Sequence, residues 1–391
     1  MLQASSGICN SVAIIGVGHT DYAGDNARGL AGERIHNSYG YAAIAFIAAL
    51  ADAEIDRSEI DGLIVGPTTA YERVGEILGI DPKWGGQADA GLAVTQACMA
   101  ISCGFAEVIA LVYGNNQRTA AVQYGGANAA SGNNFLAYVY HAPWGFTSQG
   151  ALYALSFRRF QQLYGLTEAE LGHVAVAQRQ AARLNPNAVM QKPLTIEDYL
   201  ASRYICEPLR LPDYCLVNDG GVVLIIAEAS RAKRLCKKPV FIRGIGRAEL
   251  NSNATSLEPR LFDFYLPAQK AAGKRSYEMA GLGPEDMDCL QIYDSFSLHI
   301  PLALEGYGYC ERGNAGRFMT EEGISLKGRL PVNTSGGHLS ESYMQGWNHQ
   351  VEAVRQLRGE CGARQVEACR FVHYSGDVAG KAISIIYSRE V

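Results

Sequence analysis

Two short stretches of the sequence gather side chains that can move protons. Residues 332–346 read VNTSGGHLSESYMQG, and residues 293–297 read YDSFS. The second stretch offers a phenol at Tyr293 and a carboxylate at Asp294. The first offers a double glycine, an imidazole, a hydroxyl and a phenol, at Gly336, Gly337, His338, Ser342 and Tyr343. Phenols, imidazoles and carboxylates are common general acids and bases in enzymes.

The pattern alone does not separate catalysis from packing. The chain has 21 tyrosines, and a tyrosine is most often a half-buried packing residue. Tyr293 therefore fits a core position at the end of a strand as well as a site. His338 fits a site or the surface, and His373 fits a site or a hydrogen-bonded core position. Two aspartates beside glycines, Asp219 in NDGG and Asp377 after HYSG, are expected to fix turns.

Composition excludes several classes of protein. The net charge is −5 and no run of Lys or Arg occurs, which argues against a nucleic-acid or anionic-membrane partner. No apolar run is long enough to cross a bilayer. The first residues, MLQASSGICNSVAIIGVG, lack a basic n-region and indicate a first strand, not a signal peptide. The 10 cysteines form no Cys-x-x-Cys pair, so we expect reduced thiols, a cytoplasmic location and no metal site on this chain.

The second part of the chain repeats the first. AEIDRSEIDGLIV at 53–65 aligns with AGLGPEDMDCLQI at 280–292. GGQADAGLAV at 85–94 likewise resembles GGHLSESYMQ at 336–345. Each copy alternates predicted strands and helices, which indicates an α/β protein with sheets covered by helices. A dinucleotide loop after the first strand is excluded, because its GVG lacks the third glycine at the required spacing.

These repeats predict two pseudo-symmetric halves. The N-terminal half covers 1–235, with a loop and helical excursion at about 115–200, and the C-terminal half covers 236–391. The long stretch 115–149 is rich in Gly, Asn, Ala and Tyr, and such long loops in compact domains are usually functional. We expect a site between the halves, where loops from the carboxyl ends of both sheets meet.

The chain resembles the thiolase superfamily over essentially its full length, and within it the sterol-carrier-protein-type branch. The most specific stretch is 182–221, which matches that branch in order and spacing over forty residues. The resemblance implies a five-layered αβαβα thiolase fold with mixed, mostly parallel sheets, and a homodimer. The other stretches that carry it are AALADAEIDRSEIDGLIVG, AISCGFAEVIALVYGNN, YDSFS and VNTSGGHLSESYMQGWNHQVEAVRQLRG.

The departures from a working thiolase concern its cysteines. The nucleophilic cysteine of thiolases opens the helix after the first Gly-Gly turn, and that position falls near Gln87. Cys98 and Cys103 lie towards the far end of the same predicted helix, where a thiolate gains nothing from the helix N-terminus. The second thiolase cysteine would lie at 373–376, which reads His-Tyr-Ser-Gly. Covalent acyl transfer therefore has no nucleophile at the expected positions.

The same replacements resemble a side branch, the thiolase-like aldolases that shorten steroid side chains. This resemblance implies a carbon–carbon lyase in which Tyr293 and Tyr343 are catalytic and a β-hydroxyacyl-CoA is cleaved to a ketone or aldehyde plus a short acyl-CoA. It also implies a small OB-fold, zinc-ribbon partner in a heterotetramer, with zinc on the partner only. The identity of the acyl side chain is left open: it could belong to a sterol, a bile acid or an aromatic acid.

We expect the other residues to assist the tyrosines. A phenol has an ordinary pKa of about 10 and needs help from neighbouring groups to act as a base. The candidates for that help are His338, His141 and His373, with Asp294 as a group that could orient them. The candidate substrate-binding residues are His141, Ser342, Gly336, Gly337, His373 and Gln87. Two alternatives remain at this point: a thiolase or acyltransferase with an atypical site, and a non-catalytic subunit that binds CoA esters.

Overall fold

The computed structural model describes residues 8–33, 36–122, 148–236, 238–249, 265–377 and 381–390. Its main sheet has the strand order β3-β2-β4-β7-β1-β8-β11-β10-β9, and β5 pairs with β6 in a small second sheet. The strands are β1 (Val12–His19), β2 (Gly62–Val65), β3 (Trp84–Gln87), β4 (Val108–Asn116), β5 (Tyr204–Cys206), β6 (Leu209–Arg210), β7 (Asp219–Glu228), β8 (Val240–Glu249), β9 (Cys289–Ile292), β10 (Phe371–Ser375) and β11 (Lys381–Ser388).

The strand order is pseudo-symmetric about its centre. β1 and β8 meet there through a short antiparallel pairing of Ala13 with Phe241 and Ile14 with Val240. Outward from this junction, β7, β4 and β2 of the first half correspond to β11, β10 and β9 of the second. Parallel pairs lie at the two outer ends of the sheet: β2 pairs with β3 and β4, and β9 pairs with β10. In contrast, β7 is antiparallel to both of its neighbours, β4 and β1, and β11 is antiparallel to both of its own, β8 and β10. The sheet is therefore mixed, as predicted, with parallel pairings at its outer ends and antiparallel pairings through its centre.

The predicted repeat is confirmed at the level of single turns. The 3-10 turn η1 (Arg57–Glu59) leads into β2, and η5 (Pro284–Asp286) leads into β9 in the same way. The counterpart of β3 in the second half is a single parallel bridge from Val332 to Leu290. Residues 336–346, which follow that bridge, stand where the start of α4 stands in the first half. The domain boundary at residue 235 falls between α9 and β8 and stays a proposal.

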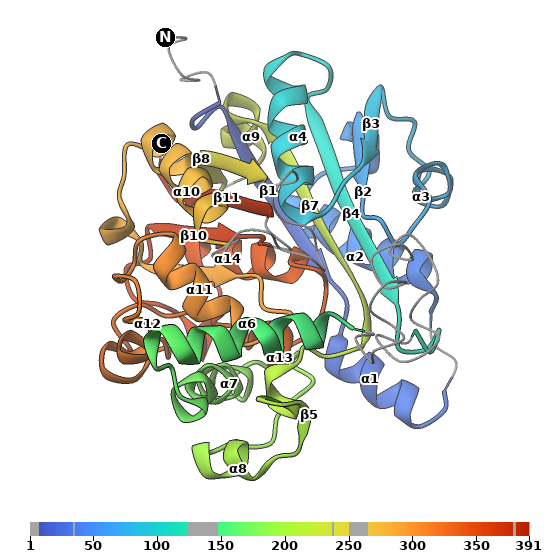
Figure 1. Cartoon of the computed structure of the whole chain (residues 1–391). Coiled ribbons are helices and arrows are strands. Elements are labelled where there is room, and N and C mark those ends of the chain that lie inside the picture. The colour runs from blue at the N-terminus through green and yellow to red at the C-terminus, as the bar shows by residue number, and fades with distance from the viewer. Residues whose placement is uncertain are drawn as a thin grey trace.

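The helices form three layers around the folded sheet (Figure 1). Helices α4 and α14 pack with the inner faces of both half-sheets in one core, so the sheet bends around them at the β1–β8 junction. Helices α2 and α3 cover the outer face of the first half, and α10 and α11 cover that of the second. This gives the predicted five layers. The helices of eight residues or more are α1 (Tyr22–Leu30), α2 (Ser38–Ala53), α3 (Tyr71–Leu78), α4 (Ala90–Ser102), α6 (Gln149–Tyr164), α7 (Glu168–Ala182), α10 (Leu266–Ala280), α11 (His299–Gly306) and α14 (Trp347–Arg358).

Shorter helical segments complete the fold. Most lie in the connections of the second half and in the excursion after β4. They are α8 (Ile196–Ala201), η4 (Leu211–Asp213), α9 (Ala229–Leu235), α12 (Ala315–Arg317), the π-helix η6 (Phe318–Gly323), α13 (Gly337–Ser340) and η7 (Gly362–Arg364).

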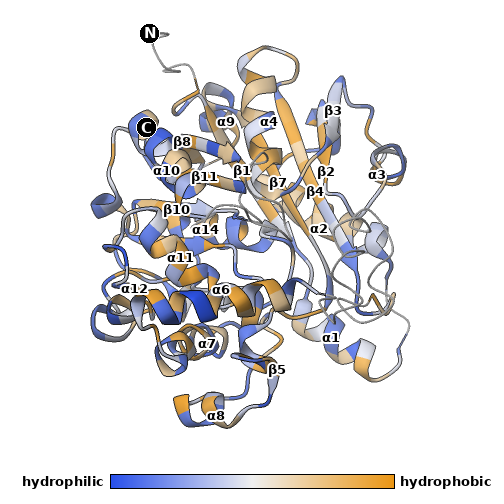
Figure 2. Ribbon diagram, in the orientation of Figure 1, coloured by the Kyte–Doolittle hydropathy of each residue, from blue (hydrophilic) through white to orange (hydrophobic). Residues whose placement is uncertain are grey.

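Glycines let the outer helices lie directly on the strands. A Cβ at Gly114 of β4 would come within 1.9 Å of the Ser38 carbonyl oxygen on α2. A Cβ at Gly246 of β8 would come within 1.8 Å of the Ala272 carbonyl oxygen on α10. The same device therefore appears in both halves. Figure 2 shows hydrophobic residues along the central strands, with hydrophilic positions more frequent on the covering helices.

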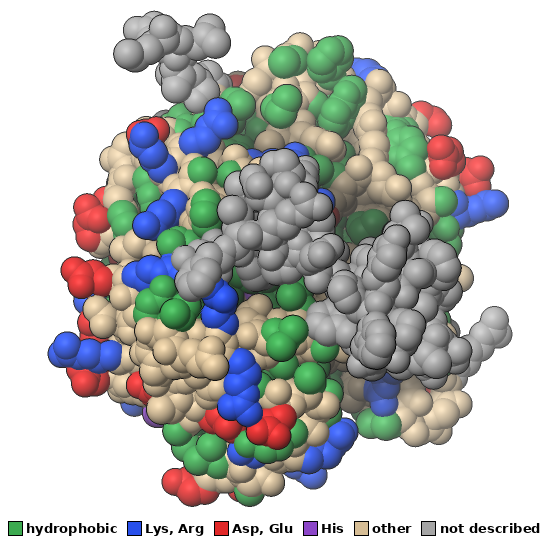
Figure 3. Space-filling view, in the orientation of Figure 1, with side chains coloured by type: hydrophobic (Ala, Val, Ile, Leu, Met, Phe, Trp, Pro, Cys, Tyr) green, Lys and Arg blue, Asp and Glu red, His purple; other side chains and the backbone are tan. Residues whose placement is uncertain are grey.

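The surface and the helices give two further observations. Basic and acidic side chains are interspersed on the face of the described residues in Figure 3, which is not the pattern of a nucleic-acid interface. Within the described part of the chain, no helix combines the length and the apolar character that crossing a membrane requires.

The excursion after β4 supplies α6 and α7, which lie beside the second half. α7 begins at Glu168, and its N-cap Thr167 forms a capping box with Glu170. α7 then packs against α13. The segment therefore closes one side of the turn that carries the predicted site residues.

Candidate active site

The two predicted tyrosines meet in the structure. Tyr293 directly follows β9, and its backbone N–H donates to the Ser375 carbonyl oxygen at 2.9 Å, which continues the sheet register. Tyr343 lies in the turn between α13 and α14. Their hydroxyl oxygens are 3.0 Å apart, so they form a hydrogen bond between residues distant in sequence. Tyr293 is only 8% exposed and Tyr343 is half-buried, so the pair lies at the edge of the core, where a substrate can reach it.

The double glycine brings backbone against Asp294. Gly336 and Gly337 have φ values of 109° and 57°, and a Cβ at Gly337 would lie 2.4 Å from Asp294 Oδ2. Because side chains are absent there, the His338 N–H donates to both oxygens of Asp294, at 3.0 and 3.2 Å. The structure thus gives both glycines a role in shaping the turn.

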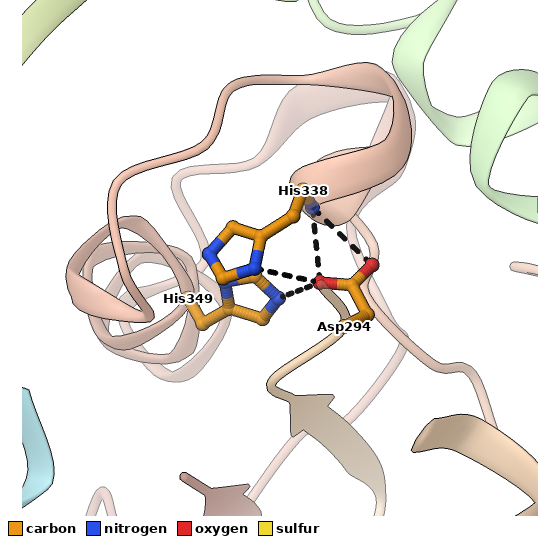
Figure 4. Close-up of side chains that lie close together, drawn as sticks. All are labelled: Asp294, His338 and His349. Atoms are coloured by element: carbon orange, nitrogen blue, oxygen red, sulfur yellow. Dashed lines mark hydrogen bonds and ion pairs between the residues drawn. The ribbon is translucent and has the colours of Figure 1, made fainter. Parts of the chain in front are cut away.

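Asp294, His338 and His349 form a fully buried cluster (Figure 4). His349 Nε2 lies 2.9 Å from Asp294 Oδ1, and His338 Nδ1 lies 3.2 Å from the same oxygen. His349 comes from α14 and was not among the sequence candidates. The available signal was the polar triplet Asn348-His349-Gln350 directly after the turn.

The proton position on His338 follows from its backbone neighbour. The Gly346 N–H donates to His338 Nε2 at 2.9 Å, so this nitrogen accepts and the proton sits on Nδ1. Burial lowers the pKa of His338 well below its usual range, which keeps the ring neutral. Its edge contacts both tyrosines, with ring centroids 4.9 Å from each. His338 therefore has no free nitrogen that could take a proton from a phenol, and it holds the pair in place.

The proton on His338 Nδ1 makes it unfavourable for the cluster to bind a metal ion. By residue type, Asp294, His338 and His349 could hold one, because one ligand atom from each lies within 4.8 Å of the others. A ligating nitrogen must be free of its proton, but Nδ1 of His338 carries it. Asp294 Oδ1 also faces the His338 N–H and His349. The donor set fits hydrogen bonding better than metal coordination.

Tyr343 is fixed by two asparagines. Its N–H donates to Asn218 Oδ1 at 2.8 Å, and Asn218 Nδ2 donates to Ser342 Oγ at 2.5 Å. Asn348 Nδ2 donates to the Ser342 carbonyl oxygen at 3.1 Å. Ser342 is 0% exposed, so the structure turns this predicted substrate-binding residue inward, where it braces the turn.

The phenols are less acidic than free tyrosine. Burial raises the pKa of Tyr343 well above 10, and the neighbouring Tyr293 raises it further. Burial also raises the pKa of Tyr293, although the hydrogen bond with Tyr343 partly offsets this. We expected neighbouring groups to make one phenol easier to ionise. That expectation is wrong, because desolvation outweighs the hydrogen bonds, and both phenols are neutral near pH 7.

A thiol that sequence reasoning missed lies near the pair. Cys215 stands in the irregular segment before β7, and its N–H donates to the Ser295 carbonyl oxygen at 3.0 Å. It is close enough to raise the pKa of both Tyr293 and Tyr343. Burial, followed by the carboxylate of Asp294, raises the pKa of Cys215 itself to about 12. This thiol is therefore protonated near neutral pH and a poor nucleophile.

The remaining predicted residues lie elsewhere. Gln87 ends β3, and its amide donates to the Thr69 carbonyl oxygen at 2.8 Å. The next helix begins only at Ala90, with Asp89 as N-cap, so no thiol stands at its start. His141 lies outside the described residues.

His373 faces away from the tyrosine pair. Its neighbours on β10, Val372 and Tyr374, point into the core around α4 and α14, and side chains alternate along a strand. His373 instead bonds Tyr309 at 2.6 Å and Ser384 at 2.7 Å. Burial lowers its pKa to about 3, so it is a neutral core histidine.

The two aspartates expected in turns differ in what their carboxylates bind. Asp219 accepts from the N–H groups of Arg118 and Thr119 at 2.9 and 3.3 Å, which fixes a turn as predicted. Asp377 is buried and accepts from the Tyr307 hydroxyl at 2.6 Å. Asp377 follows β10 in the connection to its antiparallel partner β11, as expected of a turn residue, and its buried carboxyl also accepts from Gln269 of α10 at 3.0 Å.

Comparison with known proteins gives the family. Residues 252–389 match the family described as "Thiolase C-terminal domain-like". The chain is 34% identical over 364 residues to a "Steroid side-chain-cleaving aldolase" of Thermomonospora curvata, covering 89% of this chain and 90% of that one. The chain belongs to the thiolase superfamily. It is 33% identical to a "17-hydroxy-3-oxo-4-pregnene-20-carboxyl-CoA lyase" of Mycobacterium tuberculosis, covering 90% of this chain and 92% of that one.

Solved structures agree with this assignment. A "Ltp2-ChsH2(DUF35) aldolase" superposes with a TM-score of 0.86 at 30% identity, covering 98% of this chain and all 100% of that one. Human mitochondrial 3-ketoacyl-CoA thiolase superposes with a TM-score of 0.67 at 13% identity, covering 97% and 99%, which shows the fold alone. The chain is thus a carbon–carbon lyase of the thiolase superfamily, similar to its thiolase-like aldolases.

The Cys215 thiol gives the first prediction. With its pKa raised from 9.0 to about 12, its thiolate fraction at neutral pH is roughly a thousandfold below that of an ordinary thiol. Iodoacetamide at pH 7.5 should therefore label the exposed Cys103 and leave Cys215 unmodified, as read by peptide mass spectrometry. Rapid labelling of Cys215 that also abolishes activity would instead indicate a nucleophilic thiol.

Proposed function

We propose that this enzyme is a retro-aldolase that cleaves the Cα–Cβ bond of a β-hydroxyacyl-CoA by tyrosine acid–base catalysis, without a cysteine nucleophile. The observation that carries the proposal is the 3.0 Å contact between the Tyr293 and Tyr343 hydroxyls. Aldolase and lyase names among similar proteins support the reaction class. The bulky, steroid-like side chain of the substrate is also taken from those names.

The paired phenols suit a reaction that moves one proton within the substrate. In retro-aldol cleavage the β-hydroxyl loses its proton, the Cα–Cβ bond breaks, and its electrons pass into the thioester as an enolate. The α-carbon then takes up a proton. In the net reaction the β-hydroxyl proton appears on the α-carbon, so the reaction consumes no external base.

A neutral phenol pair can carry that proton as a shuttle. One phenol accepts the hydroxyl proton as it passes its own proton to the other phenol, and the second phenol protonates the α-carbon. Each phenol ends with one proton, and neither becomes a free phenolate. The raised pKa values of Tyr293 and Tyr343 support this scheme, because each phenol must enter the reaction protonated. The direction of transfer between them is left open.

The second candidate function is thiolysis, which we consider because a thiol lies near the tyrosine pair. Cys215 lies near both phenols, where a thiol could attack a β-ketoacyl-CoA. Its pKa of about 12 speaks against this role. A non-catalytic CoA-binding subunit has no such supporting observation.

A partner subunit belongs to the proposal. The similar aldolase structure is the "Ltp2-ChsH2(DUF35) aldolase", whose name includes a DUF35 protein. We propose that this chain forms a homodimer core that binds a small OB-fold, zinc-ribbon protein to make a heterotetramer. Any zinc is proposed on that partner, and coenzyme A enters with the substrate. The cytoplasmic location stays a prediction.

The tyrosines give the test of the function. Tyr343→Phe and Tyr293→Phe keep the rings and remove the hydroxyls, so each variant should fold and lose about a hundredfold or more of kcat. The assay follows cleavage of a bulky β-hydroxyacyl-CoA without free CoA, by the protein alone and with its partner. Tyr39→Phe on α2 is the matched control and should keep full activity.

Three outcomes of that assay separate the candidates. Cleavage without free CoA that disappears in both variants supports the aldolase. Thiolysis of a β-ketoacyl-CoA with free CoA supports the thiolase instead. Unchanged cleavage in Tyr343→Phe would remove the pair from the mechanism.

The pH dependence of kcat gives a further prediction. The working form is neutral, and burial raises the pKa of both phenols above 10, so activity is present below that range and lost only above it. Between pH 7 and about 9.5 we expect no ionisation of the pair in the profile of kcat. A rise of kcat with an apparent pKa of about 8, absent from Tyr343→Phe or Tyr293→Phe, would show a phenolate base and contradict the shuttle.

A further inference from the structure

The buried cluster beneath the tyrosines contains a histidine with an acceptor at each ring nitrogen. His349 Nε2 lies 2.9 Å from Asp294 Oδ1. Its Nδ1 lies 3.2 Å from Asn348 Oδ1. The side chains of Asp294 and His349 are both 0% exposed, so bulk solvent does not reach either nitrogen.

The orientation of the Asn348 amide is set by its other partners. Asn348 Nδ2 lies 3.1 Å from the Ser342 carbonyl oxygen, which can only accept a hydrogen bond. It also lies 2.8 Å from Glu341 Oε2. The amide nitrogen must therefore face these two oxygens, and its oxygen faces His349 Nδ1. The same oxygen also lies 3.2 Å from His338 Nε2, which accepts the Gly346 N–H. Neutral imidazole has one N–H and can donate to only one of its two acceptors, whereas imidazolium donates to both.

We propose that His349 is held as an imidazolium by Asp294 and Asn348, and that this buried ion pair is the positioning device of the tyrosine pair. The role in catalysis rests on the proposed retro-aldol function. The ionisable groups that face His349 are Asp294, from the end of β9, and His338, from α13, whose ring centroid is 4.2 Å away. Glu341 reaches it only through Asn348.

Charge balance supports this arrangement. A buried carboxylate without a partner costs several kcal/mol, and the loss of one partner of a buried pair strongly destabilises a protein. Asp294 has no Lys or Arg ion pair among the described residues, so His349 is the group that can neutralise it. After burial, the nearby His349 is the next cause that lowers the pKa of His338, which keeps that ring neutral.

The ion pair acts on the tyrosines through His338. Asp294 accepts the His338 backbone N–H at 3.0 Å and so fixes the position of that residue, while the ring Nδ1 lies 3.2 Å from Asp294 Oδ1 without hydrogen-bond geometry. His338 Nε2 in turn accepts the Gly346 N–H, and Gly346 closes the turn that carries Tyr343. Tyr293 precedes Asp294 in the chain. The pair thus holds the backbone on both sides of the Tyr293–Tyr343 hydrogen bond.

The charge state can be measured without substrate. The chain has only 8 histidines, so nitrogen NMR of the whole protein labelled with [15N]histidine resolves few signals. At pH 8.5 an ordinary histidine, with a pKa of about 6.5, is neutral. We expect one histidine with both nitrogens protonated at that pH, and its signals should vanish in His349→Gln but persist in the control, His173→Gln on α7.

Kinetics test the positioning role separately. A misplaced catalytic group costs up to about a hundredfold in rate, so His349→Gln should lower kcat about tenfold to a hundredfold and change KM less than about twofold. His173→Gln should match the unaltered enzyme in both constants. If His349→Gln does not fold, the NMR spectrum of the unaltered protein still decides the charge state.

Two results would overturn the proposal. One is a spectrum at pH 8.5 in which every histidine is neutral. The other is a folded His349→Gln protein with unchanged kcat. Because the NMR measurement needs no turnover, a failure of the retro-aldolase proposal would leave the charge-state result standing, and the two failures can be told apart.

Discussion

The arrangement of this enzyme depends on one hydrogen bond between two desolvated phenols. Tyr293 and Tyr343 come from separate segments, yet their hydroxyl oxygens lie 3.0 Å apart. An isolated phenol pair has no reason to stay in that geometry, since a single hydrogen bond contributes only about 1 kcal/mol to stability. The surrounding backbone must therefore impose it. The register of β9 sets one residue, and the glycine turn before α14 sets the other.

The constraint comes from an unusual helix at the centre of the molecule. α14 lies in the middle layer, and its buried residues include Asn348, His349, Gln350, Glu352 and Gln356. Each buried polar group left without a partner costs about 1–3 kcal/mol, and Glu352 illustrates how the cost is offset. Burial alone would raise the pKa of Glu352, but the ion pair with Arg364 and the hydrogen bonds from Thr334 and Gln356 together outweigh burial and hold that pKa below its usual value. A central layer tied by such bonds has little freedom to shift, which suits a site that needs fixed distances.

Much of the fold and the identity of the tyrosine pair could be predicted from sequence. The repeat at 53–65 and 280–292 marked equivalent strands in both halves. Tyr293 and Tyr343 were singled out by the resemblance to the thiolase-like aldolases, because their spacing alone fits a packing role equally well. His349 was missed because a polar helix looks solvent-exposed in sequence, whereas the second half-sheet buries it. Ser342 was misplaced because an irregular turn has no alternation that tells which side chains point inward. The direction of the phenol pKa shift depends on burial, which only the assembled layers reveal.

The most direct test of the account is a proton inventory on the cleavage step. Single-turnover rates of a β-hydroxyacyl-CoA are measured in mixtures of H2O and D2O, so that product release does not mask the chemistry. A shuttle through two neutral phenols moves several exchangeable protons in one step, and the rate should fall along a curve as the fraction of D2O rises. A straight line would mean that one proton moves in the step, and the absence of an isotope effect would mean that none does; either result would contradict the shuttle.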